Sequence, residues 1–182
     1  KLFKQNETIN QFLRLSSFAE MMLVHENSLV KVDPEIGYEQ LALLGCGITT
    51  GLGAVLKTAQ INPGCTVAVI GCGGVGLNVI QGARIAGALR IIAIDTVENK
   101  LQMAIDHGAT DIVNPASQNI VEQIIKITNG GVDYSFDAIG AKITVEQSYE
   151  IIRPGGTATV VGLIPQGVKI ELDGGGFIDE KK

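Results

Sequence analysis

A doubly wound α/β domain built on a parallel sheet is the fold class that the sequence predicts. From residue 61 onward, short runs rich in β-branched residues alternate with amphipathic helical stretches, which is typical of a parallel sheet. Several of these runs are apolar on both alternating faces, as expected of strands that helices cover on both sides. The composition agrees, because 46% of the residues are hydrophobic and 18% are charged, which excludes a disordered chain.

The individual elements follow from this alternation in chain order. A helix is expected over 48–60, and Asn62-Pro63-Gly64 then turns the chain into the first strand. Four more helices are expected over 75–86, 97–107, 117–128 and 143–152, the second and third stopped by His107-Gly108 and Asn129-Gly130. Right-handed crossovers give the doubly wound order. The strands are expected over 66–70, 90–95, 110–114, 132–139 and 157–163.

The two ends of the chain carry other patterns. Residues 17–24 and 28–32 predict short strands with no helix between them, a piece too small to be stable alone. We therefore expect residues 1–40 to be the remnant of a β-rich domain and residues 41–182 to form the α/β domain. Near the other end, 168–172 predicts a last short strand that Gly174-Gly175-Gly176 breaks. Because the chain starts without Met and stops in a charged tail, we expect both ends to be cut.

Charge and cysteine usage exclude several classes of function. A net charge of -5 and a pI near 5.0 provide no broad positive field, so nucleic acid is not expected as a partner. We find no apolar run of about 20 residues and no signal peptide, so we expect no membrane contact and a cytoplasmic location. Cys46, Cys65 and Cys72 are odd in number and lack CxxC spacing, which indicates reduced thiols rather than a disulfide framework.

A glycine-rich turn follows the first strand and opens a helix. In Gly71-Cys72-Gly73-Gly74-Val75-Gly76 the spacing is G-x-G-x-x-G, in which the first glycine makes the tight turn and the second lets backbone approach a pyrophosphate. The third glycine allows the helix to pack closely on the strand. The amino end of the helix then faces the anion. Glycines also serve ordinary turns, so the motif depends on its context.

That context is Asp95, which ends the second strand 19 residues after Gly76. A carboxylate at about this interval accepts hydrogen bonds from the ribose hydroxyls and repels a 2′-phosphate, which predicts NAD rather than NADP. Asp95 could also cap the following helix, and both roles are compatible. Lys100 could reach the adenosine ribose or be a solvated charge. A methyltransferase would be expected to have glycine where Val75 stands.

Longer segments resemble one family in order. Gly45-Cys46-Gly47-Ile48-Thr49-Thr50-Gly51-Leu52-Gly53, the glycine turn, Asp95 and Asn129-Gly130-Gly131-Val132-Asp133-Tyr134-Ser135-Phe136 are similar to the zinc-dependent, medium-chain alcohol dehydrogenases. Within that family the chain most resembles the class III, S-hydroxymethylglutathione dehydrogenase type. The resemblance runs from about residue 18 to residue 167. It implies a Rossmann domain preceded by a short remnant of a GroES-like catalytic domain.

The resemblance implies a role for several residues. Cys46 corresponds to the third ligand of the catalytic zinc, although a buried cysteine between glycines is otherwise more often simple packing. Thr50 would lie near the nicotinamide. The residues that would bind the cofactor are Thr50, Gly71, Gly73, Gly74, Val75, Gly76, Asp95, Lys100, Ile139, Gly140, Val161, Gly162 and Leu163. The complete enzyme would use NAD and zinc, oxidise an alcohol or a thiol adduct, and form a homo-oligomer.

The family's other zinc ligands, its proton relay and its structural zinc lobe precede the region where this chain begins. His25-Glu26 lacks the preceding glycine of the family segment and is not expected to replace them, while His107 is expected to complement a helix dipole. One cysteine cannot hold catalytic zinc, which needs three protein ligands, so we expect the chain to bind NAD without turning over alcohol. A second hypothesis is a stand-alone NAD-binding or redox-sensing module. A zinc-free quinone reductase relative is disfavoured by Cys46 and by Asp95.

Overall fold

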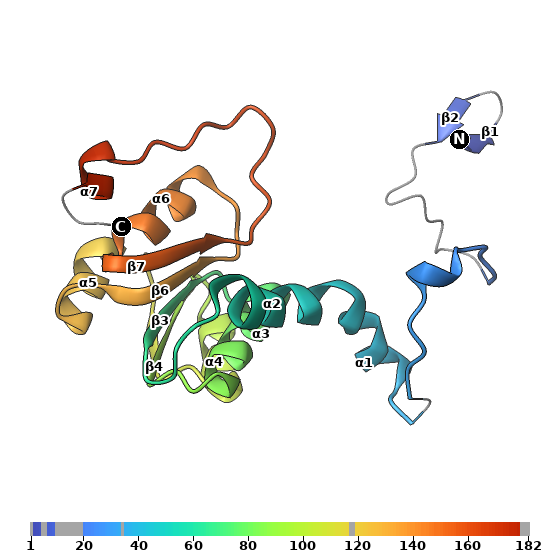
Figure 1. Cartoon of the computed structure of the whole chain (residues 1–182), viewed down its shortest axis with the longest axis horizontal. Coiled ribbons are helices and arrows are strands. Elements are labelled where there is room, and N and C mark those ends of the chain that lie inside the picture. Colours follow the sequence, from blue (N-terminus) through green and yellow to red (C-terminus); the bar gives the residue numbers. More distant parts are fainter. Residues whose placement is uncertain (1, 5–6, 10–19, 34, 117–118, 179–182) are drawn as a thin grey trace. The chain divides into compact units, whose positions relative to one another are not determined.

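The computed structural model describes residues 2–4, 7–9, 20–33, 35–116 and 119–178, and the chain divides into two compact units, Lys1–Leu41 and Ala42–Lys182 (Figure 1). In the first unit, β1 (Leu2–Lys4) pairs antiparallel with β2 (Glu7–Ile9), so that Leu2 lies opposite Ile9. Among the described residues, the next element is a 3-10 turn, η2 (Glu26–Ser28), and the His25 side chain accepts a hydrogen bond from the Asn27 amide at its start.

The strands expected over 17–24 and 28–32 are not found. Residues 17–19 lie outside the described part of the chain, residues 20–24 and 29–32 form no strand, and residue 28 belongs to η2. The apolar side chains of Met21, Leu23 and Val30 are almost fully exposed. Short alternating runs form strands only where a neighbouring strand pairs with them, and these have none among the described residues.

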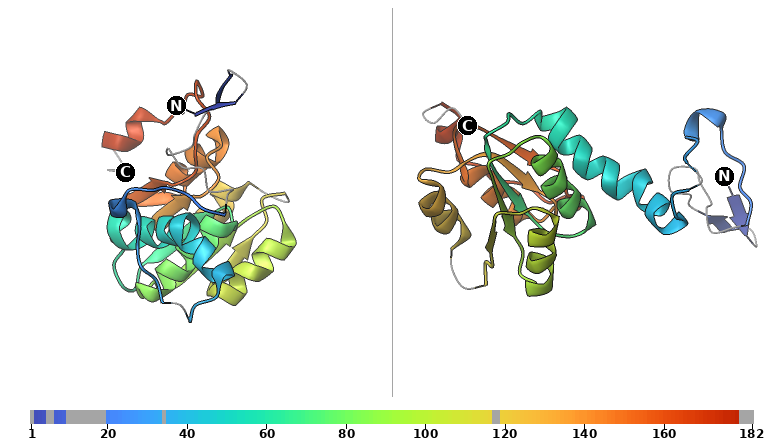
Figure 2. Two further views of the ribbon diagram at one scale, coloured as in Figure 1. Left: turned by 90° about the vertical axis from the view of Figure 1, so that its right-hand side faces the viewer. Right: turned by 90° about the horizontal axis from the view of Figure 1, so that it is seen from below.

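The second unit begins within a long helical segment. Figure 2 shows Tyr38–Ala59 as one continuous run of helical turns. It consists of α1 (Tyr38–Leu43), a π-helical stretch η3 (Leu44–Ile48), α2 (Thr49–Gly53) and a second π-helical stretch η4 (Ala54–Ala59). The helix therefore starts at Tyr38 and not at residue 48, because the glycines within it are tolerated in the helical conformation.

The expectation that the chain has no apolar run of about 20 residues is wrong for this helical segment. The segment has 22 residues and is long and apolar enough to cross a membrane by length and composition alone, a test that core helices of soluble proteins also pass. Gly51, Ala54 and Val55 are buried, and a Cβ on Gly51 would lie 2.6 Å from the Val75 carbonyl oxygen. The α2 backbone therefore packs directly against the next helix of the unit.

The sheet has five strands among the described residues, all parallel, in the order β5-β4-β3-β6-β7. Helices α3 and α4 lie on one face and α5 and α6 on the other (Figure 1). This confirms the doubly wound fold. The strands are β3 (Thr66–Ile70), β4 (Arg90–Ile94), β5 (Asp111–Val113), β6 (Val132–Asp137) and β7 (Ile152–Val160), and the helices are α3 (Gly74–Ile85), α4 (Glu98–His107), α5 (Ile120–Thr128) and α6 (Lys142–Glu150).

Both faces of the sheet are buried at the central strands β3 and β4, as the apolar runs predicted, whereas most of the edge strand β7 is exposed or half-buried. On β3, Val67 and Val69 pack in the cluster that contains α3 and α4, whereas Ala68 and Ile70 pack in the cluster of α5 and α6. All four are at most 2% exposed. At about 25 cal/mol per Å² of apolar surface, such two-sided burial dominates the stability of the domain.

The prediction was wrong around the last strand. β7 begins at Ile152 rather than 157, and the sheet register shifts between Val132 and Tyr134, so that Pro154-Gly155-Gly156 lies within an irregular edge strand. An edge strand tolerates a proline that a central strand would not. Residues 168–172 form no strand, and the glycines expected to end that strand instead begin the short helix α7 (Gly174–Ile178).

Candidate functional site

The turn between β3 and α3 has the geometry that its glycines predicted. Gly71 has a φ of +94°, a conformation that L side chains rarely adopt. A Cβ on Gly76 would lie 1.7 Å from the Gly71 carbonyl oxygen, so the helix approaches the strand end too closely for any side chain. A Cβ on Gly73 would meet nothing within 4 Å, which leaves its backbone open toward solvent. The three glycines thus supply a tight turn, close packing and an accessible backbone.

The amino end of α3 presents free amides beside this turn. Gly73 is the N-cap, and it has no side chain that could satisfy the first amides of the helix. The Cys72 amide just before it is already used, because it donates to Asp95 Oδ2 at 2.9 Å. Gly73 and Gly74 are exposed. The first amides of α3 and the positive end of the helix dipole therefore form a site suited to an anion such as a phosphate.

Asp95 follows β4 directly and is 7% exposed. Its Oδ2 accepts the Cys72 amide, and its Oδ1 accepts the Val97 amide at 2.9 Å. The N-cap of α4 is Val97, so Asp95 forms a turn before the helix and does not cap it. Each carboxylate oxygen has two lone-pair directions, so the side chain can accept further hydrogen bonds from hydroxyl groups. Lys100 Nζ lies 3.7 Å from Asp95 Oδ2.

The cysteine inside the turn is a packing residue. Cys72 is 1% exposed, and its thiol contacts the Ile94 carbonyl oxygen at 3.7 Å. Burial, together with the nearby Asp95 carboxylate, raises the pKa of the Cys72 thiol to about 12. Burial also raises the pKa of the Cys65 thiol. Both cysteines are therefore protonated near neutral pH and unreactive, since the thiolate is the nucleophile.

The ends of β6 and β7 lie side by side at the same edge of the sheet. The amides of Val161 and Gly162 donate to the Asp137 carbonyl oxygen at 2.8 and 2.9 Å. A Cβ on Gly162 would lie 2.0 Å from the Gly140 nitrogen, so the two loop backbones touch. Ile139 is 49% exposed and Leu163 92% exposed, which leaves apolar side chains uncovered at this edge.

Asp137 is a residue that the sequence prediction missed. It ends β6 as Asp95 follows β4, and its side chain is completely buried. The available signal was a carboxylate at the end of an apolar strand run, the same signal that identified Asp95.

The structure also brings Thr50 toward this edge. Thr50 and Lys57 on the helical segment line one shallow, open depression of about 420 Å³ together with Val160 and Val161 at the end of β7. Parallel strands place their carboxyl ends at one edge, where open α/β sheets bind ligands.

The described residues do not form a metal site by themselves. Cys46 is exposed and lies in the π-helical stretch η3, whereas a cysteine serving only to pack would be expected to be buried. No group of three or more His, Cys, Asp or Glu side chains that could hold a metal occurs within the described ranges. His107 lies in the last turn of α4, where its Nδ1 is 2.7 Å from the Met103 carbonyl oxygen, as expected of a residue at a helix carboxyl end.

The strand order, the glycine turn and the acidic residue at the end of β4 together define a Rossmann domain of the dinucleotide-binding class. The family model described as zinc-binding dehydrogenase matches residues 74–180, more than half of the chain. The chain belongs to this family, which confirms the resemblance stated from the motifs. The chain is therefore a cofactor-binding domain of the zinc-type alcohol dehydrogenases.

Individual relatives agree. S-(hydroxymethyl)glutathione dehydrogenase of Saccharomyces cerevisiae is 44% identical over 172 residues, which are 91% of this chain and 45% of the yeast protein. The crystal structure of benzyl alcohol dehydrogenase from Acinetobacter calcoaceticus has a TM-score of 0.81 at 34% identity over 84% of this chain and 42% of that one. A putative zinc-binding dehydrogenase from Sinorhizobium meliloti, bound to NADP, has a TM-score of 0.71 at 32% identity over 75% of this chain and 41% of that one. The chain spans less than half the length of each.

Proposed function

We propose that the chain binds NAD and forms the cofactor-binding part of an enzyme that oxidises an alcohol or an S-hydroxymethyl-thiol. The observation that carries the proposal is the Gly71 turn joined to Asp95 by the hydrogen bond from the Cys72 amide. This bond fixes the turn and the carboxylate relative to one another. Two recognition elements for one dinucleotide are therefore held in a single rigid unit.

The adenosine half of the cofactor is assigned to Asp95. Its remaining lone pairs would accept hydrogen bonds from the ribose hydroxyls, and its charge would repel the 2′-phosphate of NADP. A relative of the same fold was solved with NADP, so the fold alone does not select the cofactor. Lys100 lies beside the Asp95 carboxylate, and we assign it to the same ribose.

The pyrophosphate is assigned to the amino end of α3. The open backbone at Gly73 and Gly74 lets two phosphate groups approach the first amides of the helix. Val75 follows within the first turn of α3, and its amide belongs to the same unpaired set.

The nicotinamide is assigned to the edge formed by β6 and β7. Ile139 and Leu163 offer exposed apolar surface to a planar ring. The backbones of Gly140 and Gly162 are in close contact, so the two loops that carry these side chains lie directly against each other. Thr50 borders the same edge, because it lines the same shallow depression as Val161. Bound NAD would accept a hydride from the substrate carbon, and the sheet would place its ring.

In the complete protein, Cys46 is our candidate for the third zinc ligand. The described residues offer no set of three ligands, so we infer that the chain alone does not oxidise alcohol. For the complete protein we further propose a small-molecule substrate, a homo-oligomer and a cytoplasmic location, with no nucleic-acid partner. The acidic pI supports the exclusion of nucleic acid.

The alternative is a stand-alone NAD-binding or redox-sensing module without catalysis. Cys72 in the glycine turn does not support redox sensing by its thiol, because Cys72 is buried and its pKa is raised to about 12. The coding sequence upstream of residue 1 separates the hypotheses, because a zinc lobe in the same reading frame would favour the enzyme and a start codon near residue 1 the module.

Calorimetric titration of the 182-residue chain with NAD and NADP tests the proposed function. We expect NAD to bind more tightly than NADP. Asp95→Ala should weaken NAD binding by at least tenfold, since a hydrogen bond to a charged group is worth about 1.5–3 kcal/mol. Asp106→Ala is the matched control, because Asp106 is an exposed carboxylate on α4. Absence of NAD binding by the unsubstituted chain would contradict the proposal, and unchanged binding of both cofactors by Asp95→Ala would contradict the role of Asp95.

A further inference from the structure

Asn114 connects the end of β5 to the segment that follows Asp95. It comes directly after β5, which pairs in parallel with β4 so that Val113 lies opposite Ile94. The next residues along the two strands, Asn114 and Asp95, are therefore neighbours at the carboxyl edge of the sheet. The Asp95 amide donates to the Val113 carbonyl oxygen at 3.3 Å, which extends the pairing of the two strands to this point.

The side chain of Asn114 uses both ends of its amide group. Its Oδ1 accepts the Ala116 amide at 3.0 Å, a turn that fixes the orientation of the side chain. Its Nδ2 donates to the Thr96 carbonyl oxygen at 3.4 Å. Thr96 belongs to the segment that leads from β4 into α4, so Asn114 holds this segment from the neighbouring strand.

The segment that Asn114 holds also orients the Asp95 carboxylate. Asp95 Oδ1 accepts the Val97 amide at 2.9 Å. The Thr96 carbonyl group and the Val97 amide belong to one planar peptide group, so a contact that fixes the carbonyl oxygen also fixes the direction of the N–H. A single rigid peptide group is thus hydrogen-bonded by Asn114 through its oxygen and by Asp95 through its nitrogen.

We propose that Asn114 is a positioning residue for Asp95 and thereby contributes to the choice of NAD over NADP, an inference that rests on the proposed NAD binding. The Cys72 amide holds only Oδ2 of Asp95, so without the Val97 amide the carboxylate can turn about that one bond. A carboxylate that turns away loses its hydrogen bonds to the ribose hydroxyls and repels a 2′-phosphate less strongly. Both changes reduce the preference for NAD.

Calorimetric titration of Asn114→Ala with NAD and with NADP tests the inference. This variant removes the donor to Thr96 and leaves Asp95 in place. We expect NAD to bind more weakly and the ratio of the NADP to the NAD dissociation constant to fall about threefold, in line with the modest net value of one hydrogen bond. A role of Asn114 in general stability alone would weaken both cofactors equally and leave this ratio unchanged.

Asn119→Ala is the matched control. The Asn119 side chain also accepts the amide two residues ahead, that of Val121, at 3.1 Å, but it lies at the start of α5 and not beside the end of β4. The two variants lose the same side-chain atoms and the same kind of turn, and they differ in the donor to Thr96. Both cofactor affinities should therefore stay unchanged in Asn119→Ala.

Asp95→Ala shows whether Asn114 acts through the carboxylate. Once the carboxylate is removed, a further Asn114→Ala substitution should leave the NAD affinity unchanged, because two residues that act as a unit are not additive. Full additivity in the double variant, or an unchanged ratio in Asn114→Ala, would overturn the inference while leaving NAD binding established.

Hydrogen exchange of the unsubstituted chain keeps the inference testable if Asn114→Ala does not fold. The Val97 amide should exchange slowly, since its peptide group is held on both sides. Exchange at the rate of an unstructured peptide would show that this peptide group is not fixed and would overturn the inference. An unsubstituted chain that binds no NAD would instead contradict the proposed function.

Discussion

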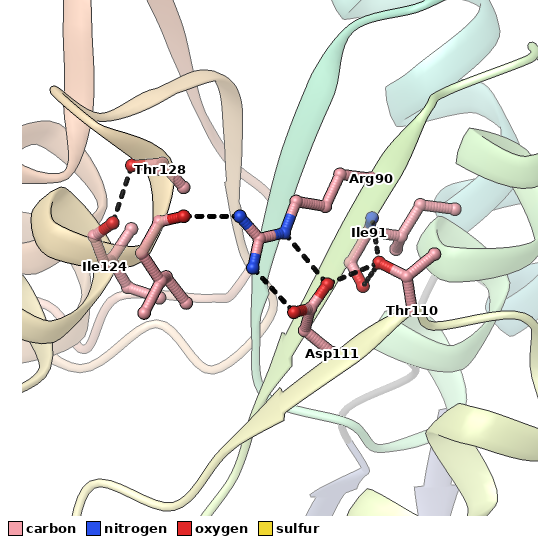
Figure 3. A network of polar contacts seen from close by, with 7 residues as sticks. Arg90, Ile91, Thr110, Asp111, Ile124 and Thr128 are labelled. Carbon is pink, nitrogen blue, oxygen red and sulfur yellow. Dashed lines mark hydrogen bonds and ion pairs between the residues drawn. The ribbon is translucent and has the colours of Figure 1, made fainter.

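Arg90 joins three elements at the amino ends of β4 and β5, and its replacement by lysine should destabilise the domain measurably. Its Nε and Nη2 donate to Asp111 at 2.9 and 2.6 Å, and its Nη1 donates to the Ile127 carbonyl oxygen in the last turn of α5 (Figure 3). Thr110 extends the network, because its hydroxyl donates to Asp111 Oδ2 at 2.7 Å. One planar guanidinium thus links two strands and a helix end.

The expected magnitude follows from geometry and exposure. Arg90→Lys keeps the positive charge but loses the fork that binds both carboxylate oxygens. Hydrogen bonds to charged groups are worth about 1.5–3 kcal/mol when buried. Here the side chains are 32% and 30% exposed, so solvent screening reduces that value. We expect a loss of about 1–2 kcal/mol, which lowers the melting temperature by about 2–8 °C for a chain of this size.

The effect should depend on pH in one direction. The Arg90 guanidinium lowers the pKa of the Asp111 carboxyl below its ordinary value. A carboxyl with a lowered pKa stabilises the fold above its unfolded pKa, which is about 3.9, and this contribution disappears as the pH falls through the folded pKa. The difference between Arg90→Lys and the unsubstituted chain should therefore be complete near pH 7 and shrink below about pH 4.

Urea unfolding monitored by circular dichroism at pH 7 and at pH 3.5 tests both the size of the stability loss and its dependence on pH. Arg84→Lys is the matched control, because Arg84 is exposed on α3 and forms no ion pair among the described residues. A change below about 0.5 kcal/mol in Arg90→Lys at pH 7, or a difference that grows on acidification, would refute the reasoning.

Three further predictions follow from the described contacts. Gly76→Ala should abolish NAD binding in calorimetry, because its Cβ would lie 1.7 Å from the Gly71 carbonyl oxygen; retained binding would contradict the tight turn. Asn119→Ala should cost about 1 kcal/mol in urea unfolding, since the Asn119 side chain accepts the Val121 amide at the start of α5, and an unchanged midpoint would count against this cap. A thiol reagent at pH 8 should label Cys46 rapidly and the two buried cysteines only after denaturation, and rapid labelling of all three would disprove their burial.

The sequence predicted most of the α/β domain because the signals there are local. The strand 66–70 was placed as found, and the ends of the other central elements were displaced by a few residues. The sequence predictions failed where pairing between strands decided the conformation. Residues 28–32 alternate like a strand but pair with no strand among the described residues. The Pro154-Gly155-Gly156 segment lies within β7 despite its breakers, because β6 pairs with β7 on both sides of it.

The residues around the glycine turn also divide into those that the sequence identifies and those that only the fold identifies. Gly71, Gly76 and Asp95 could be named from the sequence, because spacing along one strand-turn-helix unit fixes what each residue faces. Asp137 could not be assigned a role in this way. Its backbone and side chain accept amides from two loops, and only the packing of β6 against β7 brings the second loop to it.

The sequence by itself determined the class of fold, the family and the position of the glycine turn, because alternation, glycine spacing and a strand-end acid are encoded within short windows. Only the tertiary structure decided that Asp95 precedes the helix cap, that Cys72 is a buried neutral thiol, and that Asp137 fastens two loops. The physical reason is that burial and long-range hydrogen bonds depend on which distant segments meet. In a parallel sheet the order of the strands, and not their proximity in sequence, determines which segments are neighbours.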